Sequence, residues 1–223
     1  MSLEVQTLSL PDQQVYKGQP FPLALEVKTT RLGEACAWAF DNATDIETQA
    51  SKHGAVLMRG LPLASPEDFD AVVTAFGFPN FSYEESLSNA YRINYTPRVF
   101  SANEAPPEVT IFLHHEMAQT PSPPGKLFFF CQIAPAEGGA TPICRSDILW
   151  ERLREQQHDF AETCRDKGLK YSLTMAGEAD KESGMGRSWQ STFSADSREA
   201  AEARMTDLNY TWQWQSNGDL RAT

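Results

Sequence analysis

The residues alone predict a mixed fold in which helices and strands share one chain. Three observations carry this prediction: a capped amphipathic helix near residues 65–77, an apolar, phenylalanine-rich run at residues 127–133, and an alternating segment with an Asn-Gly turn near the end of the chain. The chain has 223 residues with 41% hydrophobic content, which is enough to bury a core. Because no internal repeat or linker is visible, we expect a single domain over residues 1–223.

Composition restricts the partners. The net charge of -11 argues against a broad surface for nucleic acid or for an anionic membrane, but it leaves room for a small basic pocket. No secretory signal begins the sequence, and the longest apolar run is far too short to span a bilayer. The four cysteines have no Cys-x-x-Cys spacing, which favours reduced and mostly buried thiols. We therefore expect a cytoplasmic protein, while the oligomeric state stays open.

The first third of the chain contains the strongest local signals. Residues 1–30 read as extended, and a helix is expected over residues 33–52 with Gly54 as its stop. A short buried strand follows at residues 55–60. Ser65 then provides an N-cap, followed by proline and acidic residues, and apolar residues recur at helical spacing as far as Phe76.

The remaining elements are predicted from the same signals. Residues 78–107 read as a long irregular segment of the kind that often forms a lid or a binding loop. Two helical stretches are expected over residues 146–167, followed by a strand at residues 169–174 and a helix at residues 197–207. Residues 127–133 carry apolar side chains on both faces of a strand, which predicts burial on both faces.

The last residues predict a hairpin. Residues 211–215 alternate, Asn217-Gly218 is a strong turn signal, and residues 219–223 begin a returning strand. A strand that stops so soon after its turn would be short and would leave an exposed sheet edge. We therefore expect a domain that is truncated after the Asn217-Gly218 turn.

A candidate metal site follows the apolar residues 109–113, which read as a strand. Because side chains two apart on a strand share a face, His114 and Glu116 would project together and His115 would point away. One imidazole and one carboxylate make up two-thirds of the 2-His-1-carboxylate triad that holds Fe(II). The alternative is a strand-end histidine bonded to a neighbour, with Glu116 in solvent.

A glycine-rich stretch contains a second candidate. Arg187 and Trp189 follow Gly184-Met185-Gly186, which lacks the spacing of a phosphate-binding loop. Arg187 is a candidate for substrate contact, and the competing interpretation is a surface turn anchored by the tryptophan.

Four short motifs in order resemble the taurine dioxygenase/clavaminate synthase-like family of Fe(II)- and 2-oxoglutarate-dependent oxygenases. The resemblance covers about residues 54–214, and its closest look-alikes use Glu in the first metal motif. It implies a double-stranded β-helix, or jelly-roll, core with flanking helices, incomplete at the C-terminus. The motifs are GAVLMRG at 54–60, FSANE at 100–104, HHEMA at 114–118 and GGATP at 138–142.

The resemblance also implies roles for particular residues. His114 and Glu116 would be two iron ligands, and Thr141 would donate a hydrogen bond to the distal carboxylate of 2-oxoglutarate. Family members supply a third ligand, a histidine, and a nearby arginine from a C-terminal strand region. Here the other histidines are His53, His115 and His158, and none follows the last helix.

The expected function is an Fe(II)- and 2-oxoglutarate-dependent oxygenase that uses dioxygen to oxidise a C–H bond of a small polar substrate, with an amino-acid-like molecule as one option. The main alternative is a non-catalytic relative or fragment that lacks the third ligand and serves as a binding scaffold. A reading frame that continues past Thr223 into a segment with His and Arg would favour the enzyme.

Two further alternatives are weaker. A zinc hydrolase that uses His114, His115 and Glu116 is disfavoured because adjacent side chains on a strand face opposite ways. If the chain were a purely structural interaction protein, the spacing of His114, Glu116 and Thr141 would have to be a coincidence.

Overall fold

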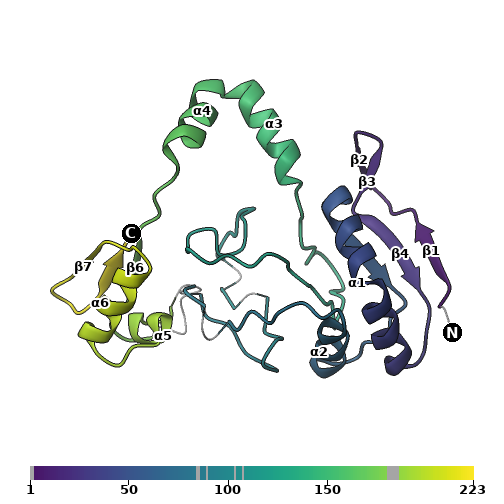
Figure 1. Ribbon diagram of the computed structural model, residues 1–223, viewed down its shortest axis with the longest axis horizontal. Helices are drawn as coiled ribbons and strands as arrows, with labels where there is room; N and C mark the ends of the chain where they lie inside the picture. Colours follow the sequence, from purple (N-terminus) through teal and green to yellow (C-terminus); the bar gives the residue numbers. More distant parts are fainter. Residues whose placement is uncertain (1–2, 84–85, 89, 103, 107, 180–185) are drawn as a thin grey trace. The chain divides into compact units, whose positions relative to one another are not determined.

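The computed structural model describes residues 3–83, 86–88, 90–102, 104–106, 108–179 and 186–223 (Figure 1). Its internal contacts divide the chain into two compact units. The first unit comprises Met1–Pro79 with Phe130–Arg152, and the second comprises Asn80–Phe129 with Leu153–Thr223. The expectation of a single domain stays a prediction.

The first unit contains a three-stranded sheet in the order β1-β4-β5. Strand β1 (Val5–Leu8) runs antiparallel to β4 (Leu23–Val27), and β5 (Val56–Arg59) runs parallel to β4. A small hairpin of β2 (Gln14–Tyr16) and β3 (Gln19–Phe21) precedes β4. The expected extended start and the strand at residues 55–60 are therefore confirmed, but β5 is partly exposed rather than buried.

Helix α1 (Leu32–His53) supplies the crossover that a parallel β4–β5 pair requires. Its buried residues include Ala35, Trp38, Ala39 and Ile46, whose spacing places them on one face. Gly54 ends the helix with φ 82°, and its N–H donates to the Ala50 carbonyl oxygen. The predicted helix and its glycine stop are confirmed.

Helix α2 (Pro66–Ala75) begins with a complete capping box. The Ser65 side chain accepts a hydrogen bond from the Asp68 N–H, and the Asp68 carboxylate accepts one from the Ser65 N–H. These bonds satisfy N–H groups that the first turn of a helix leaves without intrahelical partners. Val72 and Phe76 are buried, which confirms the predicted apolar face.

The second unit contains an antiparallel sheet in the order β6-β8-β7. The predicted hairpin is present as β7 (Trp212–Trp214) and β8 (Leu220–Ala222). Strand β6 (Leu173–Met175) pairs with the other side of β8, so the returning strand lies in the middle of the sheet. The expectation that the returning strand leaves an exposed edge is wrong, because a strand from earlier in the chain covers it.

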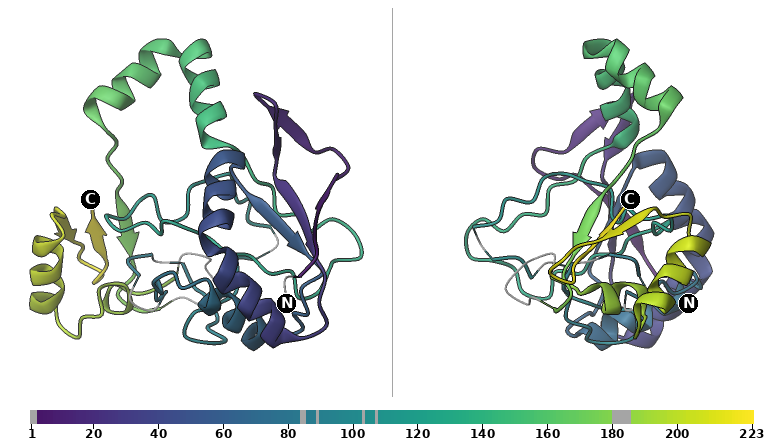
Figure 2. Two further views of the ribbon diagram at one scale, coloured as in Figure 1. Left: turned by 45° about the vertical axis from the view of Figure 1, so that its right-hand side comes forward. Right: turned by 90° about the vertical axis from the view of Figure 1, so that its left-hand side faces the viewer.

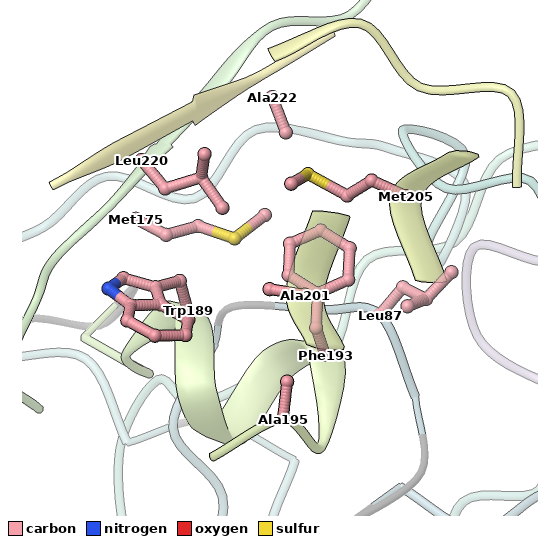
Figure 3. Close-up of a cluster of buried hydrophobic side chains, with 9 residues drawn as sticks. All are labelled: Leu87, Met175, Trp189, Phe193, Ala195, Ala201, Met205, Leu220 and Ala222. Carbon is pink, nitrogen blue, oxygen red and sulfur yellow. The ribbon is translucent and has the colours of Figure 1, made fainter. Parts of the chain in front are cut away.

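Helices α5 (Trp189–Phe193) and α6 (Arg198–Asp207) pack with this sheet. Figure 3 shows Leu220, Met175 and Ala222 pointing toward Phe193 and Met205. Ser197 caps α6 by accepting a hydrogen bond from the Ala200 N–H, as the predicted helix requires. The buried cluster consists of Leu87, Met175, Trp189, Phe193, Ala195, Ala201, Met205, Leu220 and Ala222.

The two helical stretches predicted over residues 146–167 are also present. Helix α3 (Ser146–Gln156) is followed directly by α4 (His158–Lys167), as the views in Figure 2 show. Gly168, with φ 72°, ends α4. Helix α3 buries none of its residues, so its helical structure depends on local propensity more than on packing.

Two predicted strands are wrong. Residues 109–113 and 127–133 have no regular secondary structure, and Phe112 and Ile133 are 80% and 84% exposed. A strand forms only when its backbone N–H and C=O groups find a partner strand. Within the described parts of the chain no strand pairs with either segment. The described residues therefore form a mixed helix-and-sheet structure with small sheets.

The cysteines are reduced, as expected, but they are not mostly buried. All four are free thiols, with Cys131 and Cys144 exposed and Cys36 and Cys164 partly exposed. Burial raises the pKa of the Cys36 thiol. No helix in the described ranges is both long and apolar enough to cross a lipid bilayer.

Candidate functional site

A tight turn, rather than a strand, presents the candidate metal ligands in the second unit. Met117 adopts φ 56°, which is uncommon for a residue with a side chain, and it is 3% exposed. The N–H and the hydroxyl of Thr120 both donate to the Met117 carbonyl oxygen at 2.9 Å. The buried methionine and these bonds hold the turn that follows Glu116.

His114 and Glu116 lie together within this segment. His114 Nε2 is 3.7 Å from Glu116 Oε2, with side-chain exposures of 56% and 25%. On the other side of the ring, His114 Nδ1 donates to the Phe112 carbonyl oxygen at 2.7 Å. Because a carbonyl only accepts, the hydrogen must be on Nδ1, and in the neutral ring Nε2 presents a lone pair toward the carboxylate.

This arrangement fits the donor set of a divalent transition metal. Ligating histidines usually donate their second ring N–H to a carbonyl or a carboxylate, as His114 does to Phe112. His114 Nε2 and Glu116 Oε2 lie 3.7 Å apart, so these two side chains would be the ones to hold such an ion. Imidazole and carboxylate are both ligands that Fe(II) accepts.

Among the described residues, none of the remaining histidines joins the His114–Glu116 pair. His53 is buried in α1, with Nδ1 2.8 Å from the Pro20 carbonyl oxygen, and His158 begins α4. His115 is exposed and engaged in an interaction of its own. Within the described ranges no group of three His, Cys, Asp or Glu residues could hold a metal ion. The residues that the structure describes therefore supply a two-residue site.

Thr141 belongs to the first unit, whereas the His114–Glu116 pair belongs to the second. It is exposed and follows Gly138 and Gly139, which both have φ 66°. Its hydroxyl makes no hydrogen bond with any residue that the structure describes. The Thr141 hydroxyl is therefore available to donate the expected hydrogen bond to the distal carboxylate of 2-oxoglutarate.

Arg187 is 8% exposed, so the alternative of a surface turn is wrong for this residue. Its Nη1 donates to the carbonyl oxygens of Tyr83, Ser86 and Ser88 at 3.3, 3.1 and 2.8 Å. Its Nη2 donates to the Ser191 carbonyl oxygen at 2.6 Å. The guanidinium joins α5 to the loop that begins at Tyr83, while Gly184 and Met185 lie outside the described residues.

Tyr83 is the residue that sequence reasoning missed. It is 4% exposed, and its hydroxyl lies 2.9 Å from Ser88 Oγ and 3.1 Å from the Ala90 carbonyl oxygen. Its ring packs against Phe100 with 4.7 Å between centroids. Burial raises the pKa of Tyr83, and the Glu116 carboxylate raises it further. An aromatic residue in a long loop carries no signal that would have identified it.

The comparisons with known proteins agree with the motifs. The family described as taurine catabolism dioxygenase TauD, TfdA family matches residues 19–216. The chain therefore belongs to this family, and the family resemblance is confirmed.

Two relatives extend the match. A clavaminate synthase-like protein of Arabidopsis thaliana is 37% identical over 221 residues, which are 95% of this chain and 66% of the plant protein. The dapdiamide synthesis protein DdaC of Enterobacter agglomerans is 25% identical over 195 residues, which are 87% of this chain and 56% of the bacterial protein. The chain thus spans just under two thirds and just over half of the lengths of these relatives.

Proposed function

We propose that this chain supplies iron- and 2-oxoglutarate-binding residues of a dioxygenase that oxidises a C–H bond of a small polar substrate. The single observation that carries the proposal is the approach of His114 Nε2 to Glu116 Oε2 at 3.7 Å. Two acceptors facing each other at this distance repel unless a proton or a cation lies between them. Family membership favours a metal cation over a proton.

In this proposal the chain positions its two ligands before the ion binds. The Phe112 carbonyl oxygen holds the hydrogen of His114 on Nδ1 and directs Nε2 toward the site. The Met117 turn holds Glu116 next to it. When bound, Fe(II) with 2-oxoglutarate and dioxygen supplies the oxidising power for the C–H bond, and the cosubstrate leaves as succinate and carbon dioxide.

Thr141 is proposed to donate its hydroxyl hydrogen to the distal carboxylate of 2-oxoglutarate. Its exposure and the absence of a hydrogen-bond partner among the described residues support this role. A hydroxyl suits the task because it donates to a carboxylate without adding a buried charge.

The substrate is proposed to be small and polar, and the names of the relatives support this class. The sequence also suggested Arg187 as a substrate contact. Its guanidinium already donates to carbonyl oxygens of the chain, so this role requires a ligand that accepts from the same group. It stays a prediction.

The test is an anaerobic titration of the purified chain with Fe(II) and 2-oxoglutarate, followed by the visible charge-transfer absorption of the chelate. We expect a saturable band that is lost in His114→Ala and Glu116→Ala. His158→Ala is the matched control, because it removes another exposed histidine from the second unit, and its band should equal that of the unmodified chain.

Two results would contradict the proposal. A band of full strength in both ligand variants would place the iron elsewhere. A folded chain that shows no band would favour the alternative of a non-catalytic relative or fragment, which binds a ligand or partner without a working metal centre.

A further inference from the structure

Arg92 carries a positive charge that no carboxylate neutralises within the described part of the chain. Its side chain is half-buried, and among the described residues its one hydrogen bond is a long one from Nη1 to the Tyr91 carbonyl oxygen at 3.5 Å. A guanidinium has five N–H donors in a planar fork, so most of its donors remain available. A partly buried cation without a counterion is the usual chemistry of an anion-binding group.

Arg92 lies over the ring of Tyr83, a buried residue. Its Cζ atom lies 5.7 Å from the centroid of the Tyr83 ring, within the range of a cation–π contact. The Tyr83 ring contacts Phe100, and its hydroxyl lies within hydrogen-bonding distance of Ser88 and Ala90. The guanidinium is therefore held against a buried aromatic floor, which reduces the entropy that ligand binding would cost.

The same loop is anchored at two more points. Leu87 is 6% exposed and belongs to the buried cluster of the second unit, as Figure 3 shows. Arg187 donates to the carbonyl oxygens of Ser86 and Ser88 and lies 5.8 Å from the centroid of the Tyr83 ring. Two guanidinium groups therefore contact one tyrosine in a chain whose net charge is -11. A local positive potential of this kind attracts anions.

Arg92 and the candidate ligand Glu116 both belong to the second unit. After burial and the Ser88 hydrogen bond, the charges that act on the pKa of Tyr83 are Arg92 and Arg187, which lower it, and Glu116, which raises it. Glu116 and Arg92 therefore influence the same hydroxyl group from within the second unit.

We propose that Arg92, which belongs to the same unit as His114 and Glu116, binds the carboxylate of a small ligand, with its planar fork donating to both carboxylate oxygens. The inference rests on the proposed function, because it deepens the account of what that site binds. The carboxylate belongs either to the substrate or to 2-oxoglutarate, and the experiment separates these two sources.

The first measurement needs no metal. The chain is titrated calorimetrically with N-acetylglycine and with the uncharged N-acetylglycinamide, which differ in one acidic group. We expect the acid to bind about tenfold or more tightly than the amide, since a charged hydrogen bond strengthens binding by this order. Arg92→Met should abolish the preference, and Arg92→Lys should keep part of it.

Arg198→Met is the matched control. Arg198 also lies over an aromatic ring, 4.5 Å from the Trp214 centroid, and its loss removes the same charge and the same kind of contact from α6. The control should keep the full preference for the acid. Equal binding of acid and amide by the unmodified chain would overturn the proposal, as would a preference that survives in a folded Arg92→Met chain.

The second measurement identifies the source of the carboxylate. If the affinity for 2-oxoglutarate in the iron titration falls about tenfold in Arg92→Met, the residue binds the cosubstrate. If that affinity is unchanged while the preference for N-acetylglycine is lost, it binds the substrate. Failure of the iron site itself would remove the chelate band from the unmodified chain and leave the acid-versus-amide result interpretable.

Discussion

The Arg187 guanidinium donates a 2.8 Å hydrogen bond to the carbonyl oxygen of Ser88, a residue 99 positions earlier in the chain. The same nitrogen donates to the carbonyl oxygens of Tyr83 and Ser86, and the neighbouring nitrogen donates to Ser191. One side chain thus satisfies three backbone acceptors of a loop that has no regular secondary structure. Its removal would leave buried carbonyl groups without a donor.

Replacing Arg187 with Met should therefore destabilise the second unit. Each buried acceptor left without a partner costs about 1–3 kcal/mol, and we expect a loss of at least about 2 kcal/mol in the free energy of unfolding. Urea denaturation measures this loss, and Arg187→Lys should recover part of it. Chymotrypsin should also cleave more rapidly after Tyr83 and Leu87, which are buried in the intact chain. An unchanged urea midpoint and unchanged cleavage would show that these bonds do not hold the loop.

Tyr83 should make stability depend on pH in the alkaline range. Its pKa is raised above the ordinary value of 10.0, chiefly by burial, so the folded state holds the phenol proton more tightly than the unfolded state. Its contribution is fully present below pH 10 and is lost as the pH rises through the folded pKa. Tyr83→Phe should therefore lose less stability above pH 10 than the unmodified chain in thermal unfolding.

At neutral pH Tyr83→Phe should be less stable than the unmodified chain. Tyr83→Phe removes a hydroxyl group that lies within hydrogen-bonding distance of Ser88 and Ala90, and it should cost about 1 kcal/mol. Tyr210 is the comparison, because burial also raises its pKa and Tyr210→Phe tests whether the alkaline effect belongs to one tyrosine. Identical pH profiles for the chain and for Tyr83→Phe would contradict the assignment.

Gly139 should tolerate alanine less well than its neighbour Gly138. Both residues have φ 66°, a conformation that costs an L-residue about 1–2 kcal/mol. Only at Gly139 would an added Cβ meet another group, Pro135 Cγ at 2.6 Å, whereas nothing lies within 4 Å at Gly138. In chemical denaturation Gly139→Ala should therefore lose more stability than Gly138→Ala, and equal losses would mean that Pro135 moves aside freely.

Ser65→Ala should test the capping box of α2. The substitution removes the acceptor for the Asp68 N–H and should cost about 1 kcal/mol of unfolding free energy. Ser65→Asn preserves a capping side chain and should restore most of it. A stability equal to that of the unmodified chain in Ser65→Ala would show that water replaces the cap without penalty.

The helices other than α5 were predictable because their ends are local. The Ser65 cap and the Gly54 stop lie within a few residues of the hydrogen bonds that they complete, and both are readable in the sequence. The motif with His114 and Glu116 was also readable, and its two side chains do approach each other. They do so on a turn held by Met117 rather than on the predicted strand.

The strands depended on distant partners. Residues 109–113 and 127–133 have the composition of buried strands, yet they remain irregular in the described structure because composition does not supply a pairing strand. The central place of β8 could not be anticipated either, since it depends on β6, more than forty residues earlier. Pairing is a long-range property that side-chain periodicity does not encode.

Local chemistry in the amino-acid sequence was thus enough to predict the helices other than α5, the Asn217-Gly218 hairpin and the family motifs, and to nominate His114 and Glu116 as candidate ligands. Tertiary structure alone decided that Arg187 is buried against a loop and that Tyr83 lies beneath Arg92. The physical reason is distance along the chain. Caps and turns satisfy hydrogen bonds among neighbours, whereas a buried guanidinium requires carbonyl groups that only the folded chain brings to it.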